Sequence, residues 1–244
     1  MYFRDRAQAG QLLAKKLLPY QPKNCVVVAL NRGAVIVGAQ IAMRLHANLV
    51  LMLTENISLP GLNDSFAALN TNNLMTYNKA FYSGEIEELS SEYYHFIEQQ
   101  RMEKLHKLHA LLGADGEIRP DLLNRHIIIL VSDGLATGFS LDVAMDYLKI
   151  IRSKSIVVAT PIASVSAVDR MHLVGDDVIC LDVRENYFTT DHYYDDNTLP
   201  DTDSLFKIIR NISLSWMIPA SAARFPHKPT NDTTVAGLTI QPRL

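Results

Sequence analysis

The chain has 244 residues, of which 48% are hydrophobic and 20% are charged, and its formal net charge is −3. These values suit one enzyme-sized domain and exclude a general attraction to nucleic acid or to an anionic membrane. No run approaches the roughly 18 apolar residues of a membrane-spanning helix, and the N-terminal MYFRDR lacks the apolar core of a signal peptide. We therefore expect a cytoplasmic protein, in which Cys25 and Cys180 are buried thiols and do not form a disulfide.

Helical and strand-like patterns alternate along most of the chain. Apolar residues recur at helical spacing ahead of Pro19, and short apolar runs then mark strands such as 26–30. Residues 54–79 are instead polar and rich in turn-forming residues, with one short strand expected at 74–77. The remaining expectation, in chain order, is helix 5–18, strand 26–30, a helix through 37–45, strand 48–53, helix 87–112, strand 126–131, helix 141–151, strand 155–160, helix 165–173, strand 177–183 and helix 203–216.

This order predicts an α/β fold, with a doubly wound, mostly parallel sheet and helices on both of its faces. In such sheets ligands bind beyond the carboxyl ends of the strands, which is where Arg32 and Asp133 fall. We assign residues 1–218 to this domain. Residues 219–244 are rich in Pro, Ser, Thr and Asn with little apolar periodicity, and they predict a disordered C-terminal tail.

The most informative segment is HIIILVSDGLATGFS, residues 126–140. Its apolar run ends at Asp133, Gly134 and Gly138 bracket a turn, and Ser140 precedes another helical pattern. A phosphate suits such a turn, because unpaired amides and the helix dipole both favour an anion at a helix N-terminus. The alternative is an ordinary strand–turn–helix connection. A Walker loop does not fit, since no lysine follows Gly138, and the dinucleotide pattern G-x-G-x-x-G is absent.

This segment resembles the ribose-phosphate signature of type I phosphoribosyltransferases. In that family an apolar strand ends in two acidic residues and is followed by a turn of the form x-x-Ala-Thr-Gly-x-Ser/Thr. Ser132 stands at the first acidic position of this pattern. The matching residues are Asp133, Ala136, Thr137, Gly138 and Ser140.

Other segments resemble a bacterial phosphoribosyltransferase-like subfamily, in the expected order over about residues 3–205. Residues 31–35 (NRGAV) resemble that subfamily's pyrophosphate loop, and residues 187–188 and 193–196 resemble its closing aromatic and acidic segment. The opening of the chain resembles F-x-D-R-x-x-A-G-x-x-L-A through Phe3, Asp5, Arg6, Ala9, Gly10, Leu13 and Ala14.

The resemblance implies a type I phosphoribosyltransferase fold with a small irregular hood. It also implies a reaction, in which the phosphoribosyl group of phosphoribosyl pyrophosphate passes to a nitrogenous acceptor, with Mg²⁺ present and pyrophosphate released. The catalytic residues implied are Asp133 at the ribose and Arg32 at the pyrophosphate. The binding residues implied are Ser132, Asp133, Gly134, Ala136, Thr137, Gly138, Phe139 and Ser140 for the ribose 5-phosphate, with Arg32, Gly33 and Ala34 for the pyrophosphate.

Structural interpretations of the same residues stay open beside these roles. Asp133 could cap the turn, Thr137 and Ser140 could be helix N-caps, and Arg32 could be a surface charge. The acidic and aromatic cluster at 191–196 could meet the acceptor or Mg²⁺, or could be a polar surface turn.

Several positions depart from the family pattern. Ser132 lacks the expected charge, Ala34 replaces a glycine, and Phe139 lies where a small residue is usual. Glu55 and Asn56 stand where the subfamily carries a basic pair, and a glutamate repels pyrophosphate. The sequence therefore predicts a degraded pyrophosphate site. It leaves a second class open, a catalytically weakened or inactive member that acts as a ribose-phosphate sensor or partner protein.

No cluster of residues predicts a metal site built by the protein alone. His106 and His109 indicate a solvated helix face, and the adjacent Lys104 and Lys107 indicate ion pairs along the surface of that helix. The expected partners are phosphoribosyl pyrophosphate or ribose 5-phosphate and an unidentified base, without nucleic acid or membrane. The acceptor and the oligomeric state stay open, a homodimer being one alternative.

Overall fold

The structure is a computed structural model of the chain, and it describes residues 2–21, 23–112 and 118–217, with only the backbone for 213–217. The tail predicted for residues 219–244 lies outside the described residues. Cys25 and Cys180 are free thiols; Cys25 is buried and Cys180 is half-buried. Among the helices in the described ranges, none is both long and apolar enough to cross a bilayer.

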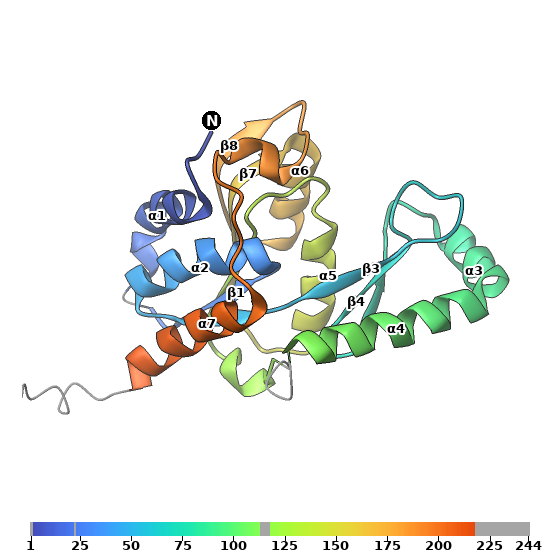
Figure 1. Cartoon of the computed structure of the whole chain (residues 1–244), viewed down its shortest axis with the longest axis horizontal. Helices are drawn as coiled ribbons and strands as arrows, with labels where there is room; N and C mark the ends of the chain where they lie inside the picture. The colour runs from blue at the N-terminus through green and yellow to red at the C-terminus, as the bar shows by residue number, and fades with distance from the viewer. Residues whose placement is uncertain (1, 22, 113–117, 218–244) are drawn as a thin grey trace, which may run out of the picture.

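A five-stranded sheet forms the centre of the molecule, and all of its neighbouring strands run parallel (Figure 1). The strand order β2-β1-β6-β7-β8 confirms the predicted doubly wound arrangement. The sheet consists of β1 (Cys25–Ala29), β2 (Asn48–Leu51), β6 (Ile127–Val131), β7 (Ser155–Ser164) and β8 (Asp177–Arg184).

Helices cover both faces of this sheet, because alternate residues of each central strand point to opposite sides. Val27 and Ile129 belong to the core shared with α1 (Arg6–Lys16), α2 (Arg32–Leu45) and α7 (Thr202–Met217). Val28 and Leu130 belong to the core on the other face, shared with α5 (Phe139–Leu148) and α6 (Val165–Val174). Burial on both faces explains why these strands have apolar runs and no alternating pattern.

The chain reverses its direction of progress across the sheet between β1 and β6, which are direct neighbours. Such a switch point leaves a crevice at the carboxyl ends of the two strands. Asn31 follows the end of β1, and Ser132 follows the end of β6. The topology therefore brings these two residues, distant in sequence, to the same edge of the sheet.

β7 is longer than the sequence pattern indicates. The sequence pattern predicts this strand over residues 155–160 only. In the structure β7 passes through Pro161 to Ser164, and the pairing with β8 continues at Ile162. This extension matters for function, because its last residues pair with the turn that follows β6: the Leu135 amide donates to the Ile162 carbonyl at 3.0 Å, and the Ser164 amide donates to the Leu135 carbonyl at 2.9 Å.

Residues 54–112 form a unit that projects beside the main sheet, called the arm below (Figure 1). The prediction of a turn-rich stretch with one short strand was incomplete, because the arm contains a three-stranded antiparallel sheet. The helix expected over 87–112 is two helices that meet at Tyr93. The elements are β3 (Thr54–Ile57), β4 (Ala67–Asn70), β5 (Met75–Tyr77), α3 (Ser83–Glu92) and α4 (Tyr94–Leu112).

The arm has its own small hydrophobic core around Phe66. The Phe66 side chain is fully buried, and the rings of Tyr77 and Phe81 meet it edge-on at centroid distances of 5.4 and 5.7 Å. Ile57 and Ile97 complete the cluster from β3 and α4. The arm strands have only three or four residues each and are separated by polar turns, so no long apolar run reveals them in the sequence.

Replacing Phe66 with Ala should destabilise the arm by about 3–5 kcal/mol, because it removes the largest fully buried side chain of this core and leaves a cavity. Urea unfolding followed by circular dichroism measures this effect. Met102→Ala on the exposed face of α4 is the control, and it should change the free energy of unfolding by less than about 0.5 kcal/mol. Equal losses in the two variants would contradict a separate core around Phe66.

Candidate functional site

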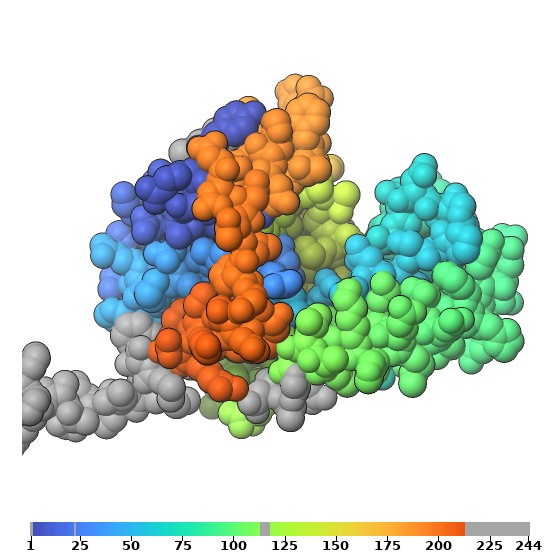
Figure 2. All heavy atoms as spheres, in the orientation of Figure 1, coloured from blue at the N-terminus to red at the C-terminus, as the bar shows by residue number. Residues whose placement is uncertain are grey.

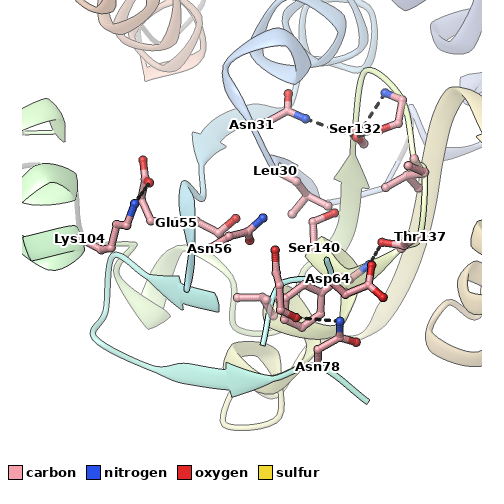
Figure 3. Close-up of a pocket in the computed structure, with 18 of the residues that line it drawn as sticks. Leu30, Asn31, Glu55, Asn56, Asp64, Asn78, Lys104, Ser132, Thr137 and Ser140 are labelled. Carbon is pink, nitrogen blue, oxygen red and sulfur yellow. Dashed lines mark hydrogen bonds and ion pairs between the residues drawn. The ribbon is translucent and has the colours of Figure 1, made fainter. Parts of the chain in front are cut away.

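A cavity of about 610 Å³ lies at the switch point of the sheet, between the carboxyl ends of β1 and β6 and the arm. Figure 2 shows the hollow between these two parts of the molecule, and Figure 3 shows the side chains around it. Polar groups dominate its lining. The residues that line it are Leu30, Asn31, Thr54, Glu55, Asn56, Asn63, Asp64, Ser65, Asn78, Lys104, Ser132, Gly134, Leu135, Ala136, Thr137, Gly138, Phe139, Ser140 and Val143.

Residues 134–140, called the glycine turn below, form one wall of this cavity and lead into α5. Gly138 is the N-cap of that helix and has a φ of +76°, which favours glycine because a Cβ there is strained. A Cβ at this position would also lie 3.0 Å from the Cβ and Cγ of Arg170. The chain therefore turns sharply at Gly138, and the N-terminus of α5 faces the cavity with the positive end of its dipole.

The glycine turn is held from behind by the extension of β7. Leu135 pairs with Ala163 as an isolated parallel bridge, and the Ser164 hydroxyl donates to the Ala136 carbonyl at 2.5 Å. The same hydroxyl accepts from the Ala167 amide at 3.0 Å and so caps α6. These contacts fix the backbone of the turn without using the amides at the start of α5.

Asp133 does not face the cavity; it forms a buried ion pair with Arg6. The two side chains are only 7% and 3% exposed, and the Arg6 Nε donates to the Asp133 Oδ2 at 2.7 Å. The other carboxylate oxygen accepts from the Asn31 amide nitrogen at 2.9 Å. Both oxygens of Asp133 are thus engaged, and the direct contact with ribose expected of it stays a prediction.

Arg6 is the centre of a wider polar cluster. Its Nη2 donates to Asp191 at 2.6 Å, its Nη1 donates to Asn197 at 3.2 Å, and its guanidinium lies 4.7 Å from the centre of the Tyr194 ring. Burial alone would lower the pKa of Arg6, but the bonds and charges of Asp133 and Asp191 outweigh it and raise the pKa. Burial and then the charge of Asp133 raise the pKa of Tyr194, so its hydroxyl remains a donor, to the Asp133 carbonyl at 2.6 Å.

The acidic and aromatic segment late in the chain packs against the N-terminus. The Phe3 amide donates to the Tyr193 carbonyl at 2.9 Å, and the Asp195 amide donates back to the Phe3 carbonyl at the same distance. The Phe3 and Tyr194 rings lie 5.6 Å apart. Tyr193 and Tyr194 are buried by these contacts. The two tyrosines of this segment therefore have a packing role against the N-terminus, and they do not line the cavity.

The loop predicted at residues 31–35 is instead the beginning of α2. Asn31 is its N-cap, and the Asn31 Oδ1 accepts from the Ala34 amide at 2.7 Å. Arg32, Gly33 and Ala34 are not among the described residues that line the cavity, and the Arg32 Nη2 donates to the Pro200 carbonyl at 3.0 Å. An N-capping side chain thus satisfies an amide that was expected to face pyrophosphate. The pyrophosphate-binding roles of these three residues stay predictions.

The remaining predicted residues do meet at the cavity. Ser132, Gly134, Ala136 and residues 137–140 all line it. Ser132, Thr137 and Ser140 are labelled among them in Figure 3. Ser132 is bonded locally, because its hydroxyl donates to the Gly134 carbonyl at 2.8 Å. Sequence reasoning missed Asn31 as a lining residue, although its place after β1 at the switch point is a signal for one.

At the opposite wall, Glu55 and Lys104 line the cavity and belong to a cluster of charges that the sequence did not reveal. Lys104 and Lys107 do not pair along the helix surface; both reach Glu55 of β3. A second cluster joins the arm to the body, since Lys79 lies 3.0 Å from the buried Asp142 of α5, which also pairs with Arg170. These contacts join residues that are far apart in sequence, so no local pattern could show them.

In the described residues, no three His, Cys, Asp or Glu side chains converge as ligands for a metal ion. His109 is bonded to the backbone, with its Nε2 lying 3.3 Å from the Thr71 carbonyl. The carboxylates at the cavity, Glu55 and Asp64, come from separate segments of the arm.

The parallel sheet, with the glycine turn and the N-terminus of α5 at its switch point, defines an α/β protein with a candidate phosphate site. The comparison with known families agrees with this class. The chain belongs to the phosphoribosyl transferase domain family, whose sequence model matches residues 5–196.

Individual relatives support the same assignment. Two Mycobacterium tuberculosis sequences, MT0597 and Rv0571c, are provisionally named phosphoribosyl transferases and are each 27% identical over 204 residues. The match covers 83% of this chain but 45% of each relative, so the chain spans less than half of their length. The crystal structure of TT1426 from Thermus thermophilus is similar at a TM-score of 0.67 and 25% identity, over 88% of this chain and 99% of that one.

Replacing Gly33 with Ala should lower the free energy of unfolding by about 2–5 kcal/mol, because the added Cβ would collide with the Asp133 carboxylate and the Arg6 guanidinium. Gly84→Ala is a matched control, since both glycines are second residues of their helices and a Cβ at Gly84 meets nothing within 4 Å. The control should be neutral or stabilising by up to about 1 kcal/mol.

Urea unfolding of the two variants beside the wild type provides the measurement. Similar unfolding midpoints for Gly33→Ala and Gly84→Ala would show that the space beside Asp133 does not need a glycine.

Proposed function

We propose that the protein binds phosphoribosyl pyrophosphate in this cavity and transfers its phosphoribosyl group to a nitrogenous acceptor. The observation that carries the proposal is the glycine turn, which presents the N-terminus of a ten-residue helix to a polar cavity at the switch point of the sheet. Family membership and the match of Asp133, Ala136, Thr137, Gly138 and Ser140 to the ribose-phosphate signature support it.

In the proposed reaction, the bond between the anomeric carbon and the pyrophosphate oxygen breaks, and its electron pair leaves with pyrophosphate. The acceptor nitrogen donates a lone pair to form the new carbon–nitrogen bond, and the proton it loses passes to solvent. Positive charge develops on the ribose as the bond breaks. The protein accelerates such a reaction by holding the ribose in place and by stabilising the charge on the leaving group.

We assign the 5-phosphate to the glycine turn, with the Thr137 and Ser140 hydroxyls as further donors. Asn31 and Ser132 line the cavity between the turn and the arm, and we place the ribose against them. Asp133 acts through Asn31 in this assignment, because it accepts from the Asn31 amide group and fixes its orientation. It is thus proposed as a positioning residue.

Mg²⁺ is proposed to enter with the diphosphate, since this ion commonly binds through substrate phosphates with one or two carboxylates. Of the two carboxylates that line the cavity among the described residues, we assign Asp64 to the ion, since Glu55 pairs with Lys104 and Lys107. When bound, Mg²⁺ neutralises charge on the leaving pyrophosphate. The acceptor base is not assigned.

A second candidate function is ribose-phosphate binding without transfer, as in a sensor. Two observations favour it: Ser132 lacks the negative charge found at its position in the family signature, and the Asp133 carboxylate is occupied by Arg6 and Asn31. Both candidates use the same phosphate turn. They differ in turnover, which is measured as pyrophosphate release from phosphoribosyl pyrophosphate in the presence of a panel of purine and pyrimidine bases.

Ser140→Asp should weaken ribose 5-phosphate binding by at least about tenfold, because it places a negative charge in the first turn of α5 beside the phosphate. The same charge interacts favourably with the helix dipole, so the folded state should be unchanged or stabilised by about 0.3–1 kcal/mol. This separates binding from folding, which a change at Gly138 cannot do, given its positive φ and its contact with Arg170.

Calorimetric titration with ribose 5-phosphate measures this effect, and Ser140→Asn serves as the uncharged control of similar size. The control loses the hydroxyl but keeps a donor in its amide group and adds no charge, so it should bind ribose 5-phosphate more tightly than Ser140→Asp does. If a folded Ser140→Asp variant bound ribose 5-phosphate with full affinity, the 5-phosphate would not lie at the glycine turn. That result would contradict the proposed function.

A further inference from the structure

We propose that Lys104 and Lys107 of α4 form the binding site for the second anionic group of the ligand, the diphosphate, and that Glu55 is the counter-ion which that group displaces. This inference rests on the proposed function, since it places the second charged end of a ligand whose first end lies at the glycine turn. It concerns the wall of the cavity formed by the arm.

The geometry of this wall is that of two cations around one carboxylate. The Lys107 Nζ lies 2.7 Å from the Glu55 Oε1, and the Lys104 Nζ lies 3.7 Å from the Glu55 Oε2. The lysines are three residues apart, so they share one face of α4, and that helix packs along β3. Each carboxylate oxygen therefore has one ammonium group beside it.

The position of this cluster relative to the glycine turn suits a ligand with two anionic ends. In Figure 3, Lys104 and Glu55 lie on one side of the cavity, Thr137 lies on the other, and Ser140 lies between them. Lys104 is the one cationic side chain among the described residues that line the cavity; Lys107 is not a lining residue and lies behind the wall, in contact with Glu55. A ribose with a phosphate at the turn would direct its other substituents toward this wall.

The lysine donors are not used up by Glu55. At 3.7 Å the Lys104 Nζ is beyond hydrogen-bond distance, and an ammonium group has three donors. The Lys107 side chain is 54% exposed, whereas Glu55 and Lys104 are 19% and 24% exposed. Because Glu55 and Lys104 are partly removed from water, each interacts more strongly with any further charge in the cavity.

The charge balance indicates an exchange and not a simple addition. Two lysines and one glutamate leave a single net positive charge at this wall, whereas a diphosphate carries more negative charge and more acceptor oxygens than one carboxylate. A diphosphate can therefore replace Glu55 as the partner of both lysines. In this arrangement Glu55 holds the lysines toward the cavity in the absence of ligand and lowers its affinity by competition.

This interpretation changes the meaning of Glu55 and Asn56. At these positions the family resemblance predicts a basic pair, and their replacement alone predicts a degraded pyrophosphate site. The structure brings two lysines to the same place from a helix later in the chain. The cationic groups are thus present at this wall, but they come from α4 and not from β3.

The test is calorimetric titration of wild type, Lys104→Met with Lys107→Met, and Glu55→Gln, using ribose 5-phosphate, phosphoribosyl pyrophosphate and inorganic pyrophosphate, with and without Mg²⁺. Methionine keeps the apolar stem of each lysine. Lys149→Met is the matched control, because Lys149 pairs with Asp146 on α5 and does not line the cavity.

The double lysine variant should bind phosphoribosyl pyrophosphate and inorganic pyrophosphate at least about tenfold more weakly, with ribose 5-phosphate affinity within about twofold of wild type. Glu55→Gln should strengthen binding of the two diphosphate ligands severalfold, because it removes the competing carboxylate. Lys149→Met should match wild type with all three ligands. Retained ribose 5-phosphate binding also shows that each variant is folded.

Three outcomes would overturn the inference: unchanged diphosphate affinity in the double variant, an equal loss for ribose 5-phosphate, or no binding of pyrophosphate to wild type. Failure of the proposed function has a different signature, in which wild type does not bind ribose 5-phosphate. If wild type then still bound pyrophosphate and the binding depended on the lysines, the cluster would be an anion site that does not bind a ribose phosphate.

Discussion

Arg6 and Asp133 meet away from water, and the arrangement of the site depends on this ion pair. Removing two charges from water is costly. The cost is offset here because both Asp133 carboxylate oxygens and all three Arg6 guanidinium nitrogens have hydrogen-bond partners. Asp133 accepts from Asn31 as well as Arg6, and Arg6 also donates to Asp191 and Asn197. The pair therefore joins α1, the end of β6 and the late acidic segment in one fixed geometry. Loss of either partner would leave a buried charge without compensation.

The same ion pair sets what the cavity can offer to a ligand. It turns the Asp133 carboxylate away from the cavity and leaves Asn31 and Ser132 at the lining. The body side of the site is thus rigid, with the glycine turn supported by β7 and the Asn31 side chain fixed by Asp133. The arm side is held by ion pairs, Lys79 with Asp142 and the α4 lysines with Glu55. Ion pairs can exchange partners with an anionic ligand, whereas the hydrogen bonds behind the glycine turn do not face the cavity. The two walls should therefore respond differently when an anionic ligand binds.

Local patterns predicted the main sheet well, because strands buried on both faces have continuous apolar runs and helices follow each of them. They predicted the arm poorly, since its strands are short, are interrupted by polar turns and derive their stability from the core around Phe66. They also misplaced the end of β7, because a proline inside a strand is unfavourable only where its missing amide is needed for pairing. In β7 the pairing with β8 resumes beyond Pro161.

The sequence by itself determined the α/β class, the strand at 126–131 and the glycine turn, because each depends on residues that are adjacent in the chain. Gly138 is an example: the sequence shows a glycine at the predicted turn, and the positive φ that it adopts is a local requirement of that turn. Only the tertiary structure decided where the charged side chains point. Asp133 faces Arg6, and Lys104 and Lys107 face Glu55, through contacts between segments that are far apart in the chain. Charges act through space, so the pairing of side chains follows from the packing of the elements and cannot be derived from spacing along the sequence.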